Sequence, residues 1–356
     1  MMLFEPLKIR DVNLKNRIMM SPMAMYSAEK GIANDFHLVH YGSRAIGGTG
    51  IIMIEATAIE KEGKITPKYL VLENEKQKNS LSRIAAFINS NGSISGIQLS
   101  HAGRKARSTI PWERNIKMKK ETVNAVAPSS LPYNEEYPTP KELSIEGIKK
   151  LEKKFARSAK MAVEAGVKII ELHSAHGYLI HEFLSPITNK RNDIYGGKIE
   201  NRIRMLIETV DEIRGSIPEG NPLFVRISGV DFVENGWGLE DSIYLAKELK
   251  NHGVDLIDCS SGGISPNVKV PEEKGYNVFI SEKIKKEAKI LVSVVGYIYQ
   301  YDFAEKILEE NKADMVSIGR ALLRDPYWAM RREIAEGKKP WPIQYERAFT
   351  VKNNLM

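Results

Sequence analysis

The stretch VKIIELHSAHGYLIHEFLSPITNKRNDIYGGKIENR, residues 167–202, joins the pattern of a buried strand to a cluster of polar side chains. Residues 167–172 are mostly apolar and β-branched, and His173, His176 and Tyr178 follow where that strand is expected to end. Imidazole and phenol groups can hold a carbonyl oxygen and deliver a proton to a neighbouring carbon. The stretch therefore predicts general acid chemistry on an electrophile at the C-terminal end of a strand.

Short apolar runs alternate with longer amphipathic stretches along the whole chain. We expect strands at residues 17–23, 50–56, 94–99, 167–173, 222–228, 254–260, 289–295 and 314–320. Helical patterns lie between them, for example at residues 144–166, 201–215 and 239–253. Strands alternating with helices form parallel sheets, so the pattern predicts an α/β fold, a (β/α)₈ TIM barrel. In such a barrel the chemistry lies at the C-terminal ends of the strands.

Two segments interrupt this alternation. Residues 103–143 are too many for a simple connection from a strand to a helix, and we expect this excursion to cap the barrel mouth. Residues 338–356 form a C-terminal tail that does not fit another barrel element, and they are expected either to dock onto a neighbouring subunit or to fray. The predicted organisation is thus one barrel domain over residues 1–337 followed by a tail.

Composition narrows the class of protein. The 356 residues include 52 Lys and Arg against 45 Asp and Glu, a formal net charge of +7, and the basic residues are scattered. This excess indicates either weak attraction for phosphorylated cofactors or simply a solvated surface, and no basic run interleaved with aromatics predicts nucleic-acid binding. Cys259 is the single cysteine, which excludes an intrachain disulfide and a cysteine-rich metal site. No apolar run approaches ~20 residues, so no membrane span and a cytoplasmic location are expected.

The ends of the last two predicted strands carry Gly296 and the pair Gly319 and Arg320. Glycine lets phosphate oxygens approach backbone N–H groups, and an arginine adds a charged fork. Many barrels bind phosphate at this place, although a pair of tight turns would leave the same pattern.

Gln98 and Arg226 end two other strands. An amide that donates and accepts suits the edge of a flat heterocycle, and an arginine suits the pyrimidine side of a reduced flavin. Each residue alone is more often a hydrogen-bonding group at the barrel rim. Together with a phosphate site across the mouth, they predict a mononucleotide lying over the barrel.

The two histidines could also be metal ligands. A metal-dependent barrel hydrolase would require a His-x-His pattern on an early strand and a late acidic ligand, whereas the first strand here ends in SPMAMY, residues 21–26. We therefore expect no metal site. A pair that binds a carbonyl is the preferred interpretation, and buried structural histidines are the alternative.

Several segments, in order, resemble the old yellow enzyme family of FMN-dependent ene-reductases, in particular its short bacterial subclass that oxidises NADPH. They are KNRI at residues 15–18, SPM at 21–23 with MY at 25–26, EAT at 55–57, QLSHAGR at 98–104, HSAHGYL at 173–179, FLSP at 183–186, Asn189, Arg191, Asp193, YGG at 195–197, NR at 201–202, VRIS at 225–228, GR at 319–320 and QYER at 344–347. The resemblance spans nearly the whole chain, and residues 173–202 carry its most specific part.

The resemblance implies FMN as cofactor, with NADPH or NADH as reductant. The isoalloxazine ring would be held by Ser21, Pro22, Met23, Ala24, Ala56, Gln98 and Arg226, and the phosphate by Gly296, Gly319 and Arg320. The subclass usually has a cysteine beside the flavin where this chain has Ala24. That difference puts the flavin potential and the substrate preference in question.

The resemblance also assigns roles toward the substrate, an α,β-unsaturated carbonyl or nitro compound. His173 and His176 would bind its oxygen, Tyr178 would donate the proton, and Tyr26 would contact it. Arg347 corresponds to an arginine that reaches into a partner subunit's site, which implies a homodimer or homotetramer.

Other functions stay open at this point. A different FMN barrel oxidoreductase, of the dihydrouridine or dihydroorotate type, would share the barrel and the phosphate site. Ala24 raises the alternative of a flavin-binding protein with little turnover. A metal-dependent hydrolase is the third alternative.

Overall fold

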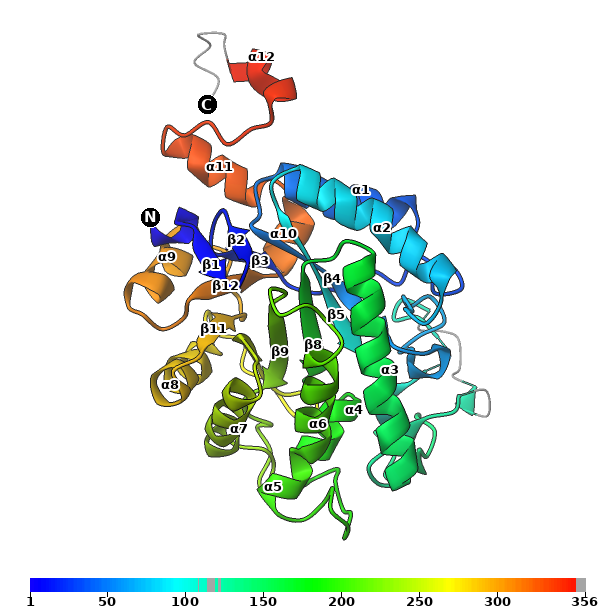
Figure 1. Cartoon of the computed structure of the whole chain (residues 1–356). Helices are drawn as coiled ribbons and strands as arrows, with labels where there is room; N and C mark the ends of the chain where they lie inside the picture. The colour runs from blue at the N-terminus through cyan, green and yellow to red at the C-terminus, as the bar shows by residue number, and fades with distance from the viewer. Residues whose placement is uncertain (108, 114–118, 121–122, 350–356) are drawn as a thin grey trace.

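Eight parallel strands close into a barrel (Figure 1). The structure is a computed structural model that describes residues 1–107, 109–113, 119–120 and 123–349. The barrel strands are β3 (Ile18–Met20), β4 (Ile51–Ala58), β5 (Ile94–Ser100), β8 (Ile169–Ser174), β9 (Leu223–Ser228), β10 (Leu256–Ser260), β11 (Leu291–Val294) and β12 (Met315–Ile318). They follow one another around the barrel in chain order, and β12 pairs with β3 to close it. The TIM barrel predicted from the sequence is confirmed.

The observed strands lie at all eight expected positions but are mostly shorter. The first differs most, because residues 21–23 leave the sheet after β3. The nitrogen of Pro22 carries no hydrogen to continue the ladder, and Ser21 makes a last backbone hydrogen bond to Ile318, at 3.0 Å. The chain therefore turns over the barrel mouth from Ser21 onward.

Helices surround the barrel, as Figure 1 shows. The longer ones are α1 (Asp35–Ile46), α2 (Glu75–Ser90), α3 (Ile145–Glu164), α6 (Arg204–Arg214), α7 (Leu239–Asn251), α8 (Val278–Ala288), α9 (Tyr301–Glu309) and α11 (Trp328–Ala335). Short helices are α4 (Leu179–Leu184), α5 (Ile199–Arg202) and α10 (Arg320–Arg324). The helix expected at residues 201–215 is divided into α5 and α6. None of these helices is long and apolar enough to cross a bilayer.

An N-terminal hairpin closes the end of the barrel at which the strands begin. Its strands β1 (Leu7–Ile9) and β2 (Val12–Leu14) pair in antiparallel fashion. Ile9 and Leu14 pack in one apolar cluster with Ile51, Ile169 and other residues near the beginnings of the barrel strands. Because this end is plugged by side chains, the C-terminal ends of the strands form the mouth available for a ligand.

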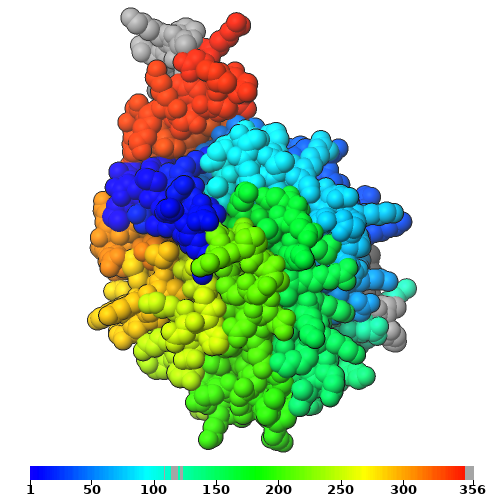
Figure 2. Space-filling view, in the orientation of Figure 1, coloured from blue at the N-terminus to red at the C-terminus, as the bar shows by residue number. Residues whose placement is uncertain are grey.

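The described part of the excursion holds η3 (Gly103–Lys105) and a small parallel sheet of β6 (Val126–Ala127) and β7 (Lys141–Glu142). The tail carries η5 (Ile343–Tyr345) and α12 (Glu346–Phe349). It projects from the barrel beyond α11, on the opposite side from α4 and α5 (Figures 1 and 2).

Candidate active site

Three aromatic side chains meet where β8 ends. The ring of His173 lies 5.2 Å from that of His176 and 4.9 Å from that of Tyr178, both measured between centroids and both edge to face. Tyr178 immediately precedes α4. The turn between β8 and α4 thus gathers the three residues that the sequence singled out for carbonyl and proton chemistry.

The backbone of His176 is held in an uncommon conformation. Its φ is +58°, a left-handed value that few residues other than glycine adopt. Its N–H donates to Ser228 Oγ at 2.9 Å, and its carbonyl accepts from Lys105 Nζ at 2.9 Å. Such conformations persist where several contacts determine them, and they cluster at functional sites.

Both imidazoles are neutral near pH 7. Burial, with a further contribution from the charge of Arg226, lowers the pKa of His173 and of His176 well below the usual value. A neutral imidazole carries one N–H donor and one acceptor nitrogen. Nε2 of His176 lies 2.7 Å from Ser260 Oγ, whereas Nδ1 of His173 is buried with no partner among the described residues. If the Ser260 hydroxyl donates to Nε2, the proton of His176 resides on Nδ1.

Tyr178 is protonated at neutral pH, as any tyrosine is, and burial raises its pKa further. The ammonium group of Lys105 lies 4.9 Å from the centre of the Tyr178 ring. Tyr26 is half-buried, and its ring lies 6.4 Å from that of Tyr69 and 5.7 Å from that of Trp112. These aromatic groups form one wall of the mouth.

The segment from Ser21 to Tyr26 crosses the mouth between β3 and α1. The Met25 N–H donates to the Glu55 carboxylate at 2.9 Å, and the same carboxylate accepts from the Tyr41 hydroxyl at 3.0 Å. The Ser21 hydroxyl is buried with no partner among the described residues. Three further residues of the segment remain partly exposed at the mouth: Pro22, Met23 and Ala24.

A buried polar network lies beneath. Gln98 Nε2 donates to Glu171 Oε1 at 2.8 Å, and Arg226 forms an ion pair with Asp258 at 2.9 Å. The barrel register explains these pairs, because Gln98 is aligned with Glu171, and Arg226 with both His173 and Asp258. Arg226 Nε is buried with no partner among the described residues, so the network has an unsatisfied donor.

The network makes stability depend on pH. Burial, reinforced by the charge of Asp258, raises the pKa of Glu171 from 4.5 to about 8, although Arg226 opposes the shift. Between these pH values the folded protein keeps a proton that the unfolded chain releases, so the free energy of unfolding falls as pH rises through this window.

Glu171→Gln keeps a partner for Gln98 without titrating and should flatten the dependence of the free energy of unfolding on pH. Urea unfolding at about pH 5 and about pH 8 measures the effect. The control is Glu234→Gln at an exposed carboxylate, and equal pH dependence in wild type and Glu171→Gln would contradict the prediction.

A cleft lies at the ends of β11 and β12. Its volume is about 370 Å³, and Gly296, Tyr297, Gly319, Arg320 and Arg324 are among the residues that line it. Gly296 has φ +144°, and a Cβ there would meet the Tyr276 ring at 3.2 Å. The Arg320 guanidinium lies 4.1 Å from the centre of the Tyr297 ring. Two arginines and glycine backbone in one cleft suit a phosphate group.

A family model described as the NADH:flavin oxidoreductase / NADH oxidase family matches residues 2–338. This chain belongs to that family, the old yellow enzymes. It is 45% identical over 350 residues to an NADPH dehydrogenase of Listeria welshimeri, covering 98% of this chain and 99% of the relative. A Bacillus subtilis NADPH dehydrogenase is 43% identical with the same coverage. The solved old yellow enzyme homologue from Zymomonas mobilis is 25% identical, with a TM-score of 0.78, over 99% of this chain and 97% of the other.

The mouth of this old yellow enzyme fits a flavin mononucleotide. Ser21 Oγ, His173 Nδ1 and Arg226 Nε are buried polar atoms with no partner among the described residues. Buried polar groups in native proteins are normally satisfied, so such atoms around one mouth indicate a polar ligand. The arginine-lined cleft at β11 and β12 supplies the cationic end that a phosphate ester requires.

Ala56 and Arg347, two further residues predicted for the site, lie in different parts of the structure. Ala56 is buried in β4 within an apolar cluster, against which Ala24, Tyr26 and Tyr178 pack. Arg347 lies in α12, which is outside the barrel and remote from α4 (Figure 1). The structure therefore does not bring Arg347 together with the histidines of the same chain. Among the described residues, no three His, Cys, Asp or Glu side chains converge as a metal site.

Three residues of the site were not singled out from the sequence. They are Lys105, Glu171 and Arg324. Glu171 left a signal, because it is a charged residue inside the otherwise apolar run IIEL. Lys105 left none, since lysine is common in loops. Glu55 and Ser260 lie at expected strand ends, but the sequence assigned neither a role.

Proposed function

We propose that this protein is an NADPH dehydrogenase that uses FMN to reduce the activated C=C bond of α,β-unsaturated carbonyl or nitro compounds. The observation that carries the proposal is the contact of His173, His176 and Tyr178 at the barrel mouth, directly beside Arg226. NADPH as reductant is supported by the names of relatives that match along their full length.

The cofactor would be held by residues from both ends of the mouth. We assign the ring to Ser21, Pro22, Met23, Ala24, Ala56, Gln98 and Arg226, and the phosphate to Gly296, Gly319 and Arg320. Bound FMN would supply hydride chemistry, receiving a hydride from the nicotinamide and passing one to the β-carbon of the alkene. Arg226, a buried cation, suits the negative charge of the reduced ring.

The two histidines would bind the substrate's carbonyl or nitro oxygen. Because both imidazoles are neutral, each has one N–H to donate, and the contact with Ser260 orients the ring of His176 before the substrate arrives. A preorganised donor at a developing oxyanion contributes on the order of 3 kcal/mol to the transition state. The pair would thus stabilise the enolate or nitronate as it forms.

Tyr178 would protonate the α-carbon. Its raised pKa keeps the phenol protonated until the carbanion-like carbon needs the proton. Lys105, held by the carbonyls of His176 and Gly263, lies beside the ring and would stabilise the phenolate that remains.

Ser260→Ala tests the assignment of the His176 proton. Loss of the hydroxyl removes the 2.7 Å contact to Nε2, so the imidazole can rest in the wrong tautomer. We expect reoxidation of the reduced flavin by an enone to slow by roughly tenfold, the effect of about one hydrogen bond, while reduction by NADPH is unchanged. Stopped-flow measurement of both half-reactions checks this, and Ser261→Ala is the neighbouring control. Unaltered enone reduction in Ser260→Ala would contradict the assignment.

The tail would serve a neighbouring copy of the chain. We propose a barrel of residues 1–337 and a tail of residues 338–356, with Arg347 reaching the substrate site of the next subunit in a homodimer or homotetramer. The projection of α12 away from its own mouth supports this. Light scattering on the purified protein should give a multiple of the 40.1 kDa chain mass, and a monomer would contradict it.

Anaerobic rapid mixing tests the proposed function as a whole. NADPH should bleach the flavin, and cyclohexenone should then restore its absorbance at a rate consistent with steady-state turnover. Reoxidation by uridine in tRNA or by orotate, with none by the enone, would instead select another FMN barrel enzyme. Bound FMN that no electron acceptor of these classes reoxidises would indicate a flavin-binding protein with little turnover.

A further inference from the structure

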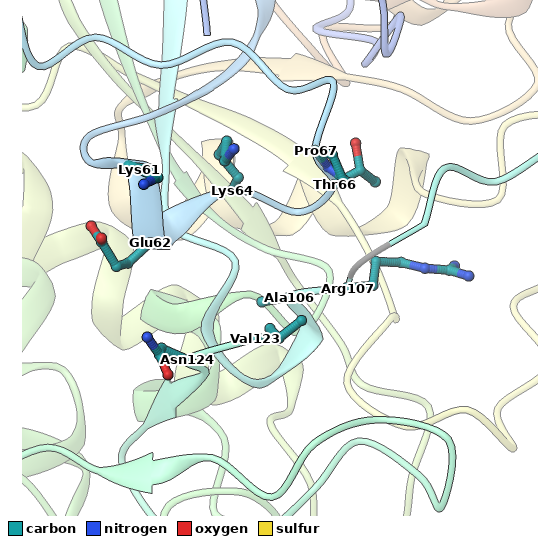
Figure 3. A pocket seen from close by; sticks show the side chains of 9 residues that line it. All are labelled: Lys61, Glu62, Lys64, Thr66, Pro67, Ala106, Arg107, Val123 and Asn124. Carbon is teal, nitrogen blue, oxygen red and sulfur yellow. The ribbon is translucent and has the colours of Figure 1, made fainter. Parts of the chain in front are cut away.

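A second cavity lies beside the barrel mouth, between the loop that follows β4 and the excursion that follows β5 (Figure 3). Its volume is about 350 Å³. The lining residues used below are Lys61, Lys64, Thr66, Ala106, Arg107 and Val123. In Figure 3 Lys61 lies on one side of the cavity and Thr66 and Arg107 lie on the other, with Ala106 and Val123 between them, and the Arg107 side chain extends away from Lys61 and Lys64.

The lining of the cavity carries an excess of positive charge. Three cations line it, Lys61, Lys64 and Arg107, against one carboxylate, Glu62. A second carboxylate, Glu73, accepts from the Lys61 backbone N–H at 3.1 Å. Burial, reinforced by the charge of Lys61, lowers the pKa of Lys64, although the charges of Glu62 and Glu73 oppose the shift. A bound anion would add to the charges that favour the ammonium form of Lys64.

Two polar atoms at the cavity wall are buried without partners among the described residues. They are the hydroxyl oxygen of Thr66, a residue that is 1% exposed, and Nε of Arg107. A hydroxyl, an arginine and two lysines are the groups that bind a phosphate ester in proteins. Buried polar groups are rarely left unsatisfied, and a polar ligand in the cavity would satisfy these two atoms, although the Arg107 guanidinium also donates to Thr109 Oγ1 at 3.3 Å and lies over the Tyr137 ring.

The cavity is formed before any ligand binds. The Arg107 N–H donates to the Ile65 carbonyl at 2.9 Å, and the Ala102 N–H donates to the Gly63 carbonyl at 2.9 Å. These hydrogen bonds fasten the excursion to the loop after β4. The cations are therefore presented by two segments whose backbones are fixed to each other.

The cavity adjoins the catalytic mouth. Ala106 belongs to the apolar cluster against which Val123, Tyr26 and Tyr178 pack. The charge of Arg107 lowers the pKa of both tyrosines, although burial, which raises it, is the larger influence. A ligand with one end over Tyr26 and Tyr178 can thus extend an anionic group into the cavity.

We propose that this cavity binds the 2′-phosphate of NADPH and selects NADPH over NADH. The inference rests on the proposed function, in which a nicotinamide dinucleotide is the reductant. A phosphate monoester carries ≈ −1.5 to −2 charges at pH 7. Three cations against one carboxylate leave two positive charges to meet it. NADH lacks this group and would leave the cations without an anion.

Charge reversal tests the proposal. In the holoenzyme, Lys61→Glu/Lys64→Glu should raise the Kd of NADPH for flavin reduction by at least about tenfold, since charge-assisted hydrogen bonds to phosphate are lost. The Kd of NADH and the limiting rate of flavin reduction should change less than about twofold. Lys68→Glu, at an exposed lysine of the same loop that does not line the cavity, is the matched control. Equal weakening of NADPH and NADH, or no weakening of either, would overturn the proposal.

Binding of 2′,5′-ADP, measured calorimetrically on the holoenzyme, separates this proposal from the proposed function because it needs no turnover. Wild type should bind 2′,5′-ADP at least about tenfold more tightly than 5′-AMP, and the double variant should lose the difference. Coenzyme A carries a comparable phosphate monoester. If coenzyme A binds in the cavity while 2′,5′-ADP does not, the site serves a thioester substrate and the NADPH assignment is wrong.

Discussion

Tyr178→Phe should slow reoxidation of the reduced enzyme by cyclohexenone by about 10²-fold or more, while flavin reduction by NADPH changes less than about threefold. The substitution removes one oxygen and keeps the ring that contacts His173. General acid catalysis contributes to protonation of the α-carbon and not to hydride transfer from the nicotinamide. Separate stopped-flow measurement of the two half-reactions shows where the loss lies.

The matched control for Tyr178→Phe is Tyr133→Phe. The Tyr133 ring also lies against Lys105, at 4.6 Å from Nζ, so the control removes a nearby phenol without removing the proposed donor. It should leave both half-reactions near wild-type rates. If Tyr178→Phe slows both half-reactions equally, or slows neither, Tyr178 is not the proton donor.

Replacing both histidines should lower the rate of enone reduction more than any other substitution in the mouth. In His173→Ala/His176→Ala both donors to the substrate oxygen are lost. We expect enone reduction to fall by about 10⁴-fold and the Kd of a phenolic ligand for the oxidised enzyme to rise by about 10²-fold. Titration of the oxidised enzyme with p-hydroxybenzaldehyde, followed in the flavin absorbance, measures the second effect without turnover.

Two further variants distinguish loss of the two hydrogen-bond donors from disruption of the structure around them. His176→Asn keeps an N–H donor and a side chain that tolerates the left-handed backbone at φ +58°, so it should retain more activity than alanine. His252→Ala removes a surface histidine that pairs with Asp211, and it should change neither quantity. Unchanged phenol binding in the double alanine variant would remove both histidines from the carbonyl site.

The fold was largely predictable because its signals are local. A short run rich in β-branched residues, such as residues 167–172, favours a strand, and eight such runs that alternate with helical patterns are typical of a (β/α)₈ barrel. The strand ends were predicted less well. Residues 21–23, for example, look like a continuing strand, yet they leave the sheet where Pro22 cannot continue the ladder.

The position of a candidate site residue was predictable where it lies near a strand end, as His173, Gln98 and Arg226 do. The contacts between strands were not, since they depend on the barrel register. Glu171 meets Gln98 because the two are aligned across β5 and β8, and Ser260 meets His176 over a separation of 84 residues. A single sequence contains no direct signal of either alignment.

The role of Arg347 stays a prediction, because it concerns a contact between two copies of the chain. Within one chain α12 is remote from the mouth, so neither the sequence nor the fold of a single copy brings Arg347 to a substrate. The role of residues 103–143 as a cap also stays a prediction, and in the described part of this excursion Lys105 donates to the carbonyl of His176. Residues 108, 114–118 and 121–122 of that excursion lie outside the described residues.

The central claim is that FMN lies across the barrel mouth with its phosphate at Arg320 and its ring beside Arg226. Titration of the flavin-free protein with FMN, followed by quenching of flavin fluorescence, tests it most directly. We predict stoichiometric binding of one FMN per chain, with binding weakened by at least about tenfold in Arg320→Ala. A protein that is purified without colour and quenches no FMN fluorescence at any concentration tested would contradict the account.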